Sequence, residues 1–191
     1  MVNEKEALRS RLLARRAALS PAEREAAALA LSARAPELLA GARTVAAYVS
    51  LGSEPGTRPL LDRLRTTGVR VLLPVLLPDN DLDWAEYTGP GALAPARLGL
   101  LEPTGPRLGV DAVTAVDAVL LPGLAVGPQG LRLGRGGGSY DRVLARLGRA
   151  GAHPRLITLL YDEELLPHVP TEPHDAPVDA VLTPRRTLHF P

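Results

Sequence analysis

Val116-Asp117-Ala118-Val119-Leu120-Leu121, followed by Pro122-Gly123, begins the part of the sequence that decides the fold. This short apolar run predicts a buried strand, and a glycine-rich segment, residues 130–142, follows it. A helix is expected from about Gly138 to Leu147, and Leu156–Leu160 predicts a second buried strand. A strand, a helix and a strand in this order indicate parallel strands joined by a crossover helix.

The same alternation extends outward on both sides of this stretch. Strands are predicted at 44–51, at 69–75, at 82–87 as a short edge strand, and at 178–182 as the last strand. Helices are predicted at 4–18, 20–39 and 57–67, with Ser20 and Thr57 as caps, whereas 88–110 predicts an ordered but irregular excursion. We therefore expect an α/β fold: a single three-layer domain over residues 1–191, Rossmann-like, with a mostly parallel sheet and helices on both faces.

The composition excludes several classes of protein. The 191 residues carry a formal net charge of +1, contain no cysteine, and are 46% hydrophobic. Near-neutral charge disfavours broad binding to nucleic acid or to an anionic membrane, and the absence of cysteine removes disulfides, a thiolate nucleophile and cysteine-bound zinc. Apolar runs are too short to span a bilayer, and residues 1–20 do not resemble a signal peptide. We expect a cytoplasmic monomer that acts on small molecules.

The basic residues are distributed unusually between lysine and arginine. Lys5 is the only lysine, and all the other residues among the 22 Lys and Arg are arginine. Coding bias explains such a replacement wherever either residue merely keeps a surface solvated. The one remaining lysine therefore marks a position where arginine does not serve equally well, although chance retention is the alternative.

The glycine-rich segment carries the densest chemical signal. It reads Gly130-Leu131-Arg132-Leu133-Gly134-Arg135-Gly136-Gly137-Gly138-Ser139-Tyr140-Asp141-Arg142 and lies between a predicted strand and a predicted helix. Glycines let several backbone N–H groups point at one anion, and the following helix adds the positive end of its dipole. The segment is neither a Walker A loop nor G-x-G-x-x-G. It predicts a phosphate cradle, and a flexible glycine-rich surface loop is the alternative.

Three carboxylates are candidates for ligand contacts. Asp141 follows the cradle, where Mg²⁺ would offset its repulsion of phosphate, but it is equally typical of a helix first turn. Asp179 interrupts an apolar strand, and on its own it is more often a cap or an arginine partner than a ligand. Glu54 follows the first strand at the same sheet edge as the cradle, where it could accept N–H groups of a substrate.

Other side chains give weaker signals. Trp84 and Tyr87 could stack on a flat ring, although such aromatics usually pack in the core or at an edge. His174 is the histidine with an adjacent carboxylate, Asp175. No histidine pair has the spacing of a zinc site, and no G-x-S-x-G supports a serine nucleophile.

Several segments together resemble the 5-formyltetrahydrofolate cyclo-ligase family, also called 5,10-methenyltetrahydrofolate synthetases. The resemblance covers nearly the whole chain, and the glycine-rich segment with its Tyr-Asp ending is its most specific part. The segments are Lys5-Glu6-Ala7-Leu8-Arg9, Tyr48–Leu51 with Glu54 and Thr57, Glu102-Pro103, Leu121–Ala125, Arg132–Arg142, and Glu172–Asp175 with Val178-Asp179.

This resemblance implies a reaction and a set of site residues. The reaction is closure of 5-formyltetrahydrofolate to 5,10-methenyltetrahydrofolate, with ATP as co-substrate and Mg²⁺ as cofactor. The implied ATP-binding residues are Lys5, Glu6, Ala7, Leu8, Arg9, Arg132, Leu133, Gly134, Arg135, Gly136, Gly137, Gly138, Ser139 and Tyr140. The implied folate-binding residues are Arg9, Val49, Glu54, Arg135, Gly136, Gly137, Gly138 and Ser139. Asp141 and Asp179 would bind the metal, and Lys5, Arg135 and Tyr140 would act in catalysis.

The chain departs from the family pattern at three places. Ser139 stands where the family usually has the first of two tyrosines. Val126 and Gly127 replace an aromatic residue and an aspartate, and a family glutamine is replaced near Glu164. We interpret these differences as drift within the family.

Two other functions compete with this interpretation. One is a sugar-phosphate or acyl-transfer enzyme that uses the cradle without hydrolysing ATP. The other is an RNA- or protein-binding module with a basic face on the first two helices. Glutamates interleave with the arginines of those helices, and this mixture is typical of a solvated surface.

Overall fold

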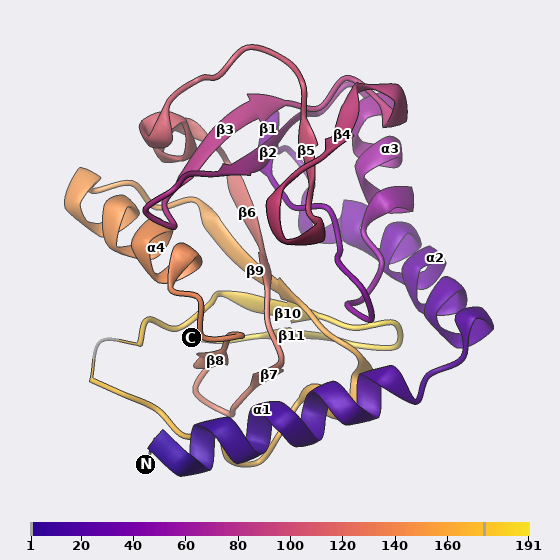
Figure 1. The fold of residues 1–191 in the computed structure, drawn as a ribbon, viewed down its shortest axis with the longest axis vertical. Helices are drawn as coiled ribbons and strands as arrows, with labels where there is room; N and C mark the ends of the chain where they lie inside the picture. Colours follow the sequence, from indigo (N-terminus) through magenta and orange to yellow (C-terminus); the bar gives the residue numbers. More distant parts are fainter. Residues whose placement is uncertain (1, 174) are drawn as a thin grey trace.

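The computed structural model describes residues 2–173 and 175–191. A seven-stranded sheet forms its centre, in the order β11-β10-β9-β6-β1-β2-β3 (Figure 1). The strands are β1 (Thr44–Ala46), β2 (Arg70–Leu76), β3 (Leu82–Glu86), β6 (Ala118–Pro122), β9 (Arg155–Leu159), β10 (Ala180–Leu182) and β11 (Thr187–His189). The five inner strands pair in parallel, and β3 and β11 close the two edges in antiparallel pairs. The mostly parallel α/β sheet is confirmed.

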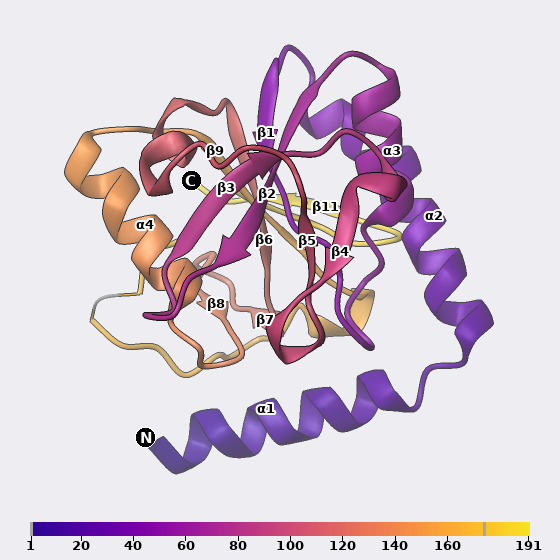
Figure 2. The same cartoon turned by 45° about the horizontal axis from the view of Figure 1, so that its top comes forward.

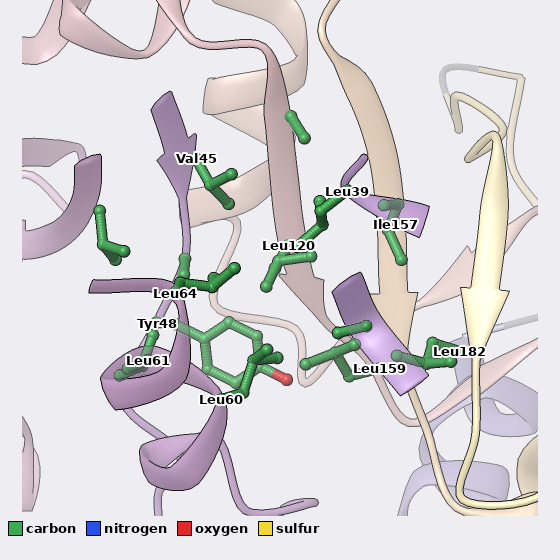
Figure 3. Close-up of a cluster of buried hydrophobic side chains, with 14 of the residues drawn as sticks. Leu39, Val45, Tyr48, Leu60, Leu61, Leu64, Leu120, Ile157, Leu159 and Leu182 are labelled. Carbon is green, nitrogen blue, oxygen red and sulfur yellow. The ribbon is translucent and has the colours of Figure 1, made fainter. Parts of the chain in front are cut away.

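Helices cover both faces of this sheet, as the long apolar runs of its strands require. On one face lie α2 (Pro21–Leu38) and α3 (Arg58–Thr66), and on the other lie α4 (Ser139–Ala150) and the short helix η3 (Val110–Ala115) (Figure 1). Figure 3 shows the first interface, where side chains of α3 meet Leu120, Ile157 and Leu159 of the strands. Ser20 and Glu23 form the predicted capping box of α2. The three layers are therefore confirmed.

The first helix, α1 (Val2–Ala17), belongs to neither layer. It crosses the molecule beside the short hairpin of β7 (Ala125–Val126) and β8 (Arg132–Leu133), as both views show (Figures 1 and 2). Leu8 and Leu12 are buried there against Leu124 and Leu133. The helix thus packs its apolar side on the segment that leads into the glycine-rich loop.

Four local expectations need correction. The first strand ends at Ala46, and beyond the hydrogen bond from Ala47 N–H to the carbonyl of Leu72 the chain continues as a loop. Thr57 does not cap α3 with its side chain: its hydroxyl donates to the carbonyl of Tyr48 and accepts the N–H of Ser50. The excursion contains a second hairpin, β4 (Leu93–Pro95) with β5 (Leu101–Pro103). The short helix η1 (Pro90–Ala92) precedes it, and the short helix η2 (Arg97–Gly99) connects its two strands.

The last strand is also different from the prediction. The chain continues beyond β10 through a turn into β11, which pairs antiparallel with it. Another short helix, η4 (Asp162–Glu164), follows β9. Both elements are too short to produce a clear periodic pattern in the sequence.

Candidate active site

A cavity of about 500 Å³ lies beyond the carboxyl ends of the central strands. Segments far apart in the sequence contribute to its walls, among them the loop after β1, the glycine-rich segment, and the N-terminal half of α1. Open α/β sheets bind ligands at this edge, because the loops that leave parallel strands converge there. Of the implied site residues, Lys5, Arg9, Val49, Glu54 and all of 132–141 line the cavity.

The glycine-rich segment curves around one end of the cavity. Gly136 and Gly138 adopt positive φ angles of 94° and 75°, a backbone region that residues with a Cβ rarely enter. The Arg9 guanidinium lies about 3.5 Å from the point that a Cβ on Gly136 would occupy, and its Nε donates to the carbonyl of Gly134 at 2.9 Å. Gly138 precedes α4 and provides no side-chain cap for it. The first N–H groups of the helix belong to the cavity-lining residues Ser139, Tyr140 and Asp141, so they are available to an anion.

The two arginines of this segment differ in their freedom. Arg132 is fixed: its guanidinium donates to the carbonyl of Pro122 at 2.8 Å and lies 3.4 Å from the Asp141 carboxylate. Its burial lowers the pKa of Arg132. Arg135 is half-exposed, with Nη1 at 3.6 Å from Glu54. Arg132 is therefore a fixed part of the cavity wall, whereas Arg135 is open to solvent.

Lys5 extends from α1 into the cavity and forms ion pairs with two acidic side chains there. Its ammonium lies 3.0 Å from Glu172 and 3.3 Å from Asp175, and only 13% of its side chain is exposed. Glu6 and Ala7 point to solvent on the same helix, and Leu8 is buried in the apolar contact of α1. The helix therefore presents Lys5 and Arg9, one turn apart, and not the whole run 5–9.

Glu54 lines the cavity from the loop after β1. One of its carboxylate oxygens accepts the N–H of Leu51 at 2.7 Å. Burial raises the pKa of Glu54, and this effect outweighs the opposing hydrogen bond and the nearby Arg135 charge. Val49 and Tyr48 lie beside it in the same loop. The group is suited to accept N–H groups from a ligand that displaces water.

Tyr140 contributes a buried hydroxyl. This oxygen has no hydrogen-bond partner among the described residues, and burial raises the pKa of Tyr140 well above its ordinary value. Buried hydroxyls are normally paired, so an unpaired one in a cavity wall marks a place where a ligand atom could bond. Ser139 lines the cavity as well.

The structure does not bring Asp179 to Asp141. Asp179 precedes β10, at the amino end of the parallel strands, where its carboxylate accepts the N–H of Leu156 at 2.7 Å. Asp141 lies at the carboxyl end, with 60% of its side chain exposed, and it lines the cavity. The second aspartate in this cavity is Asp175, not Asp179. The two aspartates expected at the metal, Asp141 and Asp179, therefore lie at opposite ends of the parallel strands.

One wall of the cavity was not expected from the sequence. The β4–β5 hairpin contributes Leu98, Leu100, Leu101 and Glu102, and the neighbouring strands add Leu76 and Leu82. The only sequence signal for this wall was Glu102-Pro103 in the resemblance. Trp84 and Tyr87 are buried in the core, so they do not stack on a ligand. His174 lies outside the described residues.

Two features of the described residues bear on the expected class of site. No group of three or more histidine, cysteine or acidic side chains is arranged to hold a metal ion there. No helix in that part of the chain is long and apolar enough to cross a membrane.

Comparisons with known proteins agree with this geometry. The sequence profile of the 5-formyltetrahydrofolate cyclo-ligase family matches residues 1–184. The chain is 44% identical to the 5-formyltetrahydrofolate cyclo-ligase of Mycolicibacterium smegmatis over 189 residues, which cover 96% of this chain and 95% of that one. The corresponding enzyme of Escherichia coli K12 is 33% identical over 182 residues, covering 92% and 98%.

Solved structures give the same result for the fold. The 5,10-methenyltetrahydrofolate synthetase of Aquifex aeolicus superposes with a TM-score of 0.83 at 25% identity, covering 97% of this chain and 92% of that one. The synthetase of Mycoplasma pneumoniae has a TM-score of 0.74 at 21% identity, with coverages of 94% and 98%. The chain therefore belongs to the 5-formyltetrahydrofolate cyclo-ligase family and is an enzyme of that family.

Proposed function

We propose that this enzyme closes 5-formyltetrahydrofolate to 5,10-methenyltetrahydrofolate in a reaction that consumes ATP and requires Mg²⁺. The formyl oxygen attacks the γ-phosphorus of ATP, and ADP leaves. N10 then attacks the activated formyl carbon and loses its proton, and phosphate carries away the former formyl oxygen as the ring closes. Such a reaction depends on positioning and charge neutralisation rather than on a nucleophile from the protein.

The nucleotide would bind at the glycine-rich end of the cavity. Its phosphates would face the open N–H groups at the start of α4, together with Lys5, Arg9 and Arg135. Lys5 forms ion pairs with Glu172 and Asp175, which line the cavity beside α1. The observation that carries this proposal is the convergence of these cations on a backbone of positive-φ glycines.

Magnesium would bind between Asp141 and Asp175. Both carboxylates line the cavity, and Mg²⁺ is commonly held by one or two carboxylates together with substrate phosphates and waters. This hard-oxygen donor set fits the ion, and it explains why a larger acidic cluster is not needed. The ion would offset the charge of the phosphates, and Asp141 would contact it from the first turn of α4.

The folate would occupy the other half of the cavity. Glu54 supports this assignment, because a carboxylate with a raised pKa in a largely buried loop can accept the N–H groups of a pterin ring. Val49 and the hairpin leucines 98, 100 and 101 provide apolar contact for the flat rings. The Tyr140 hydroxyl is available to the reacting formyl group or to the phosphate that meets it.

The test is an assay of methenyl product and released phosphate with the purified chain. We expect product only with 5-formyltetrahydrofolate, ATP and Mg²⁺ together, and one phosphate for each product. Product formed without ATP would contradict the proposal. Binding of sugar phosphates without ATP use would favour the sugar-phosphate alternative, and tight RNA binding would favour the binding module. The cytoplasmic location and the monomeric state stay predictions.

A further inference from the structure

A buried ion pair lies directly behind the cavity. Arg16, near the end of α1, has 2% of its surface exposed, and Glu164, in η4, has 5%. Two hydrogen bonds join them: Arg16 Nε donates to Glu164 Oε1 at 2.6 Å, and Nη2 donates to Oε2 at 2.8 Å. The guanidinium also lies over the Tyr161 ring, 5.7 Å from its centroid. None of these three residues lines the cavity.

On one side, the contacts of this pair extend to the proposed nucleotide subsite. Arg16 Nη2 donates to the carbonyl of Gly123 at 2.6 Å. Gly123 lines the cavity, and a Cβ there would approach the Arg132 side chain to 3.1 Å and Thr158 to 2.9 Å. The turn at Gly123 is therefore packed directly against Arg132, so its position decides where that guanidinium lies.

On the other side, the contacts of the pair extend to the proposed folate subsite. Glu164 Oε2 accepts the N–H of Tyr161 at 2.9 Å, and the Tyr161 hydroxyl donates to the carbonyl of Ser53 at 3.1 Å. Ser53 immediately precedes Glu54 in the loop after β1. A continuous series of contacts thus runs from Gly123, through Arg16, Glu164 and Tyr161, to the residue beside Glu54.

Stability alone does not account for such a pair. Two buried charges lose their hydration, and replacing a buried ion pair with apolar side chains is often neutral or stabilising. Burial would lower the pKa of Arg16, but the hydrogen bond and the charge of Glu164 raise it, so the guanidinium stays charged. The pair instead contributes positioning, because its hydrogen bonds fix α1, the turn at Gly123 and the segment from Tyr161 to Glu164 relative to one another.

We propose that Arg16 and Glu164 are positioning residues that set the separation of the two substrate subsites. They act through the Gly123 turn on one side and through Tyr161 and Ser53 on the other, without touching either substrate. This inference rests on the proposed function, because the formyl oxygen and the γ-phosphorus must meet at a defined distance. A displacement of about 1 Å between reacting groups can cost about 100-fold in rate.

The decisive variant replaces both charges, Arg16→Met with Glu164→Leu. Arg16→Met alone leaves a buried carboxylate without its partner and should lower the melting temperature, whereas the double variant should recover most of that loss. We expect the double variant to have a kcat about 10- to 100-fold below wild type, with KM for ATP and for 5-formyltetrahydrofolate each within about threefold. Each substrate's binding, measured by calorimetry, should be equally unchanged.

A second ion pair provides the matched control. Arg146 binds Asp81 through two hydrogen bonds of 3.0 and 2.7 Å, and their side chains are 14% and 13% exposed. Arg146→Met with Asp81→Leu should change the melting temperature but leave kcat at the wild-type value. Should the Arg16 and Glu164 double variant not fold, Glu164→Gln, which keeps the shape and one acceptor, should still lower kcat by more than the control.

The outcomes separate the two proposals. A folded double variant with wild-type kcat would overturn the positioning role, and so would a loss confined to the KM of one substrate. A wild-type enzyme that neither binds ATP nor needs it would instead overturn the proposed function, whatever the variants do.

Discussion

The two ends of the central sheet use acidic side chains in opposite ways. At the amino end, Asp117 accepts the N–H groups of Arg43 and Thr44, and Asp179 accepts that of Leu156. Each of these aspartates directly precedes a strand and bonds to the backbone where a neighbouring strand starts. At the carboxyl end, Glu54 and Asp141 follow strands and line the cavity.

This difference teaches how to interpret an acid beside a parallel strand. An acid before the strand meets backbone N–H groups that the sheet leaves unbonded, so its role is structural. An acid after the strand lies where the loops converge, so it is available to a ligand. Asp179 directly precedes its strand, and its hydrogen bond to the N–H of Leu156 agrees with the structural role among the two that the sequence left open.

The largest contrast should come from alanine variants at the two ends. Asp141→Ala and Asp175→Ala should each lower kcat/KM by about 100-fold or more, because each removes a carboxylate ligand of the proposed Mg²⁺ site. Asp179→Ala should keep kcat/KM within about threefold and lower the free energy of unfolding by about 1 kcal/mol, since it removes a hydrogen bond to the backbone. Steady-state kinetics and urea unfolding measure the two effects.

The comparison would fail if the pattern were reversed. If Asp179→Ala abolished the Mg²⁺-dependent activity while Asp141→Ala stayed active, the metal would lie at the amino end of the sheet.

Lys5→Met should produce the next largest effect. We expect KM for ATP to rise about 30-fold, the scale of a lost charge-assisted hydrogen bond, and this effect should be much larger than the effect on stability. Lys5→Arg is the matched variant, and it should recover only part of the affinity because arginine is larger and planar. Unchanged ATP kinetics in Lys5→Met would remove Lys5 from the site.

Glu54→Gln tests the carboxyl-end acid by pH. The folded-state pKa of Glu54 is raised by burial, so folding favours its protonated form, and wild type loses stability as pH rises through that pKa. Glutamine removes this loss. The variant should therefore melt at a higher temperature than wild type at pH 8, and the difference should vanish below the ordinary pKa of glutamate.

The same variant should bind folate less well. We expect KM for 5-formyltetrahydrofolate to rise about 10-fold, because a neutral amide accepts N–H groups more weakly than a carboxylate. Equal melting temperatures of wild type and Glu54→Gln at every pH would show that burying the charged Glu54 carboxylate does not destabilise the fold.

The smallest effect is expected at Leu98, on the tip of the β4–β5 hairpin. This leucine lines the cavity with 71% of its surface exposed and holds a left-handed backbone, with φ of 60°. Leu98→Gly should relieve that backbone strain, so the melting temperature should not fall. KM for folate should rise about threefold through the lost apolar contact, with KM for ATP unchanged. A threefold rise for ATP instead would place the hairpin on the nucleotide side.

The layers of the fold followed from the sequence, because apolar runs and caps are local signals. The strand at Ala118–Pro122, the helix at Ser139–Ala150 and the capping box at Ser20 were predicted closely. The hairpin β4–β5 and the strand β11 were not, since three-residue strands have no usable periodicity.

The site was predictable where one segment carried it. Glycine-rich 132–141 lines the cavity as a whole, because its chemistry lies in consecutive residues. The partners of Lys5 and the pair of Arg16 with Glu164 depend on contacts across most of the chain, and no local pattern marks them. Asp175 was not expected in the cavity either, because it and Asp179 both precede β10 and only the path of the loop brings Asp175 to Lys5.

The position of the metal tests the central claim most directly. Crystals grown with Mn²⁺ in place of Mg²⁺, and with a non-hydrolysable ATP analogue, would be measured at the manganese absorption edge. The proposed site predicts an anomalous peak between the carboxylates of Asp141 and Asp175, in contact with the phosphates. A peak at Asp179 or Asp117, at the other end of the sheet, would contradict it.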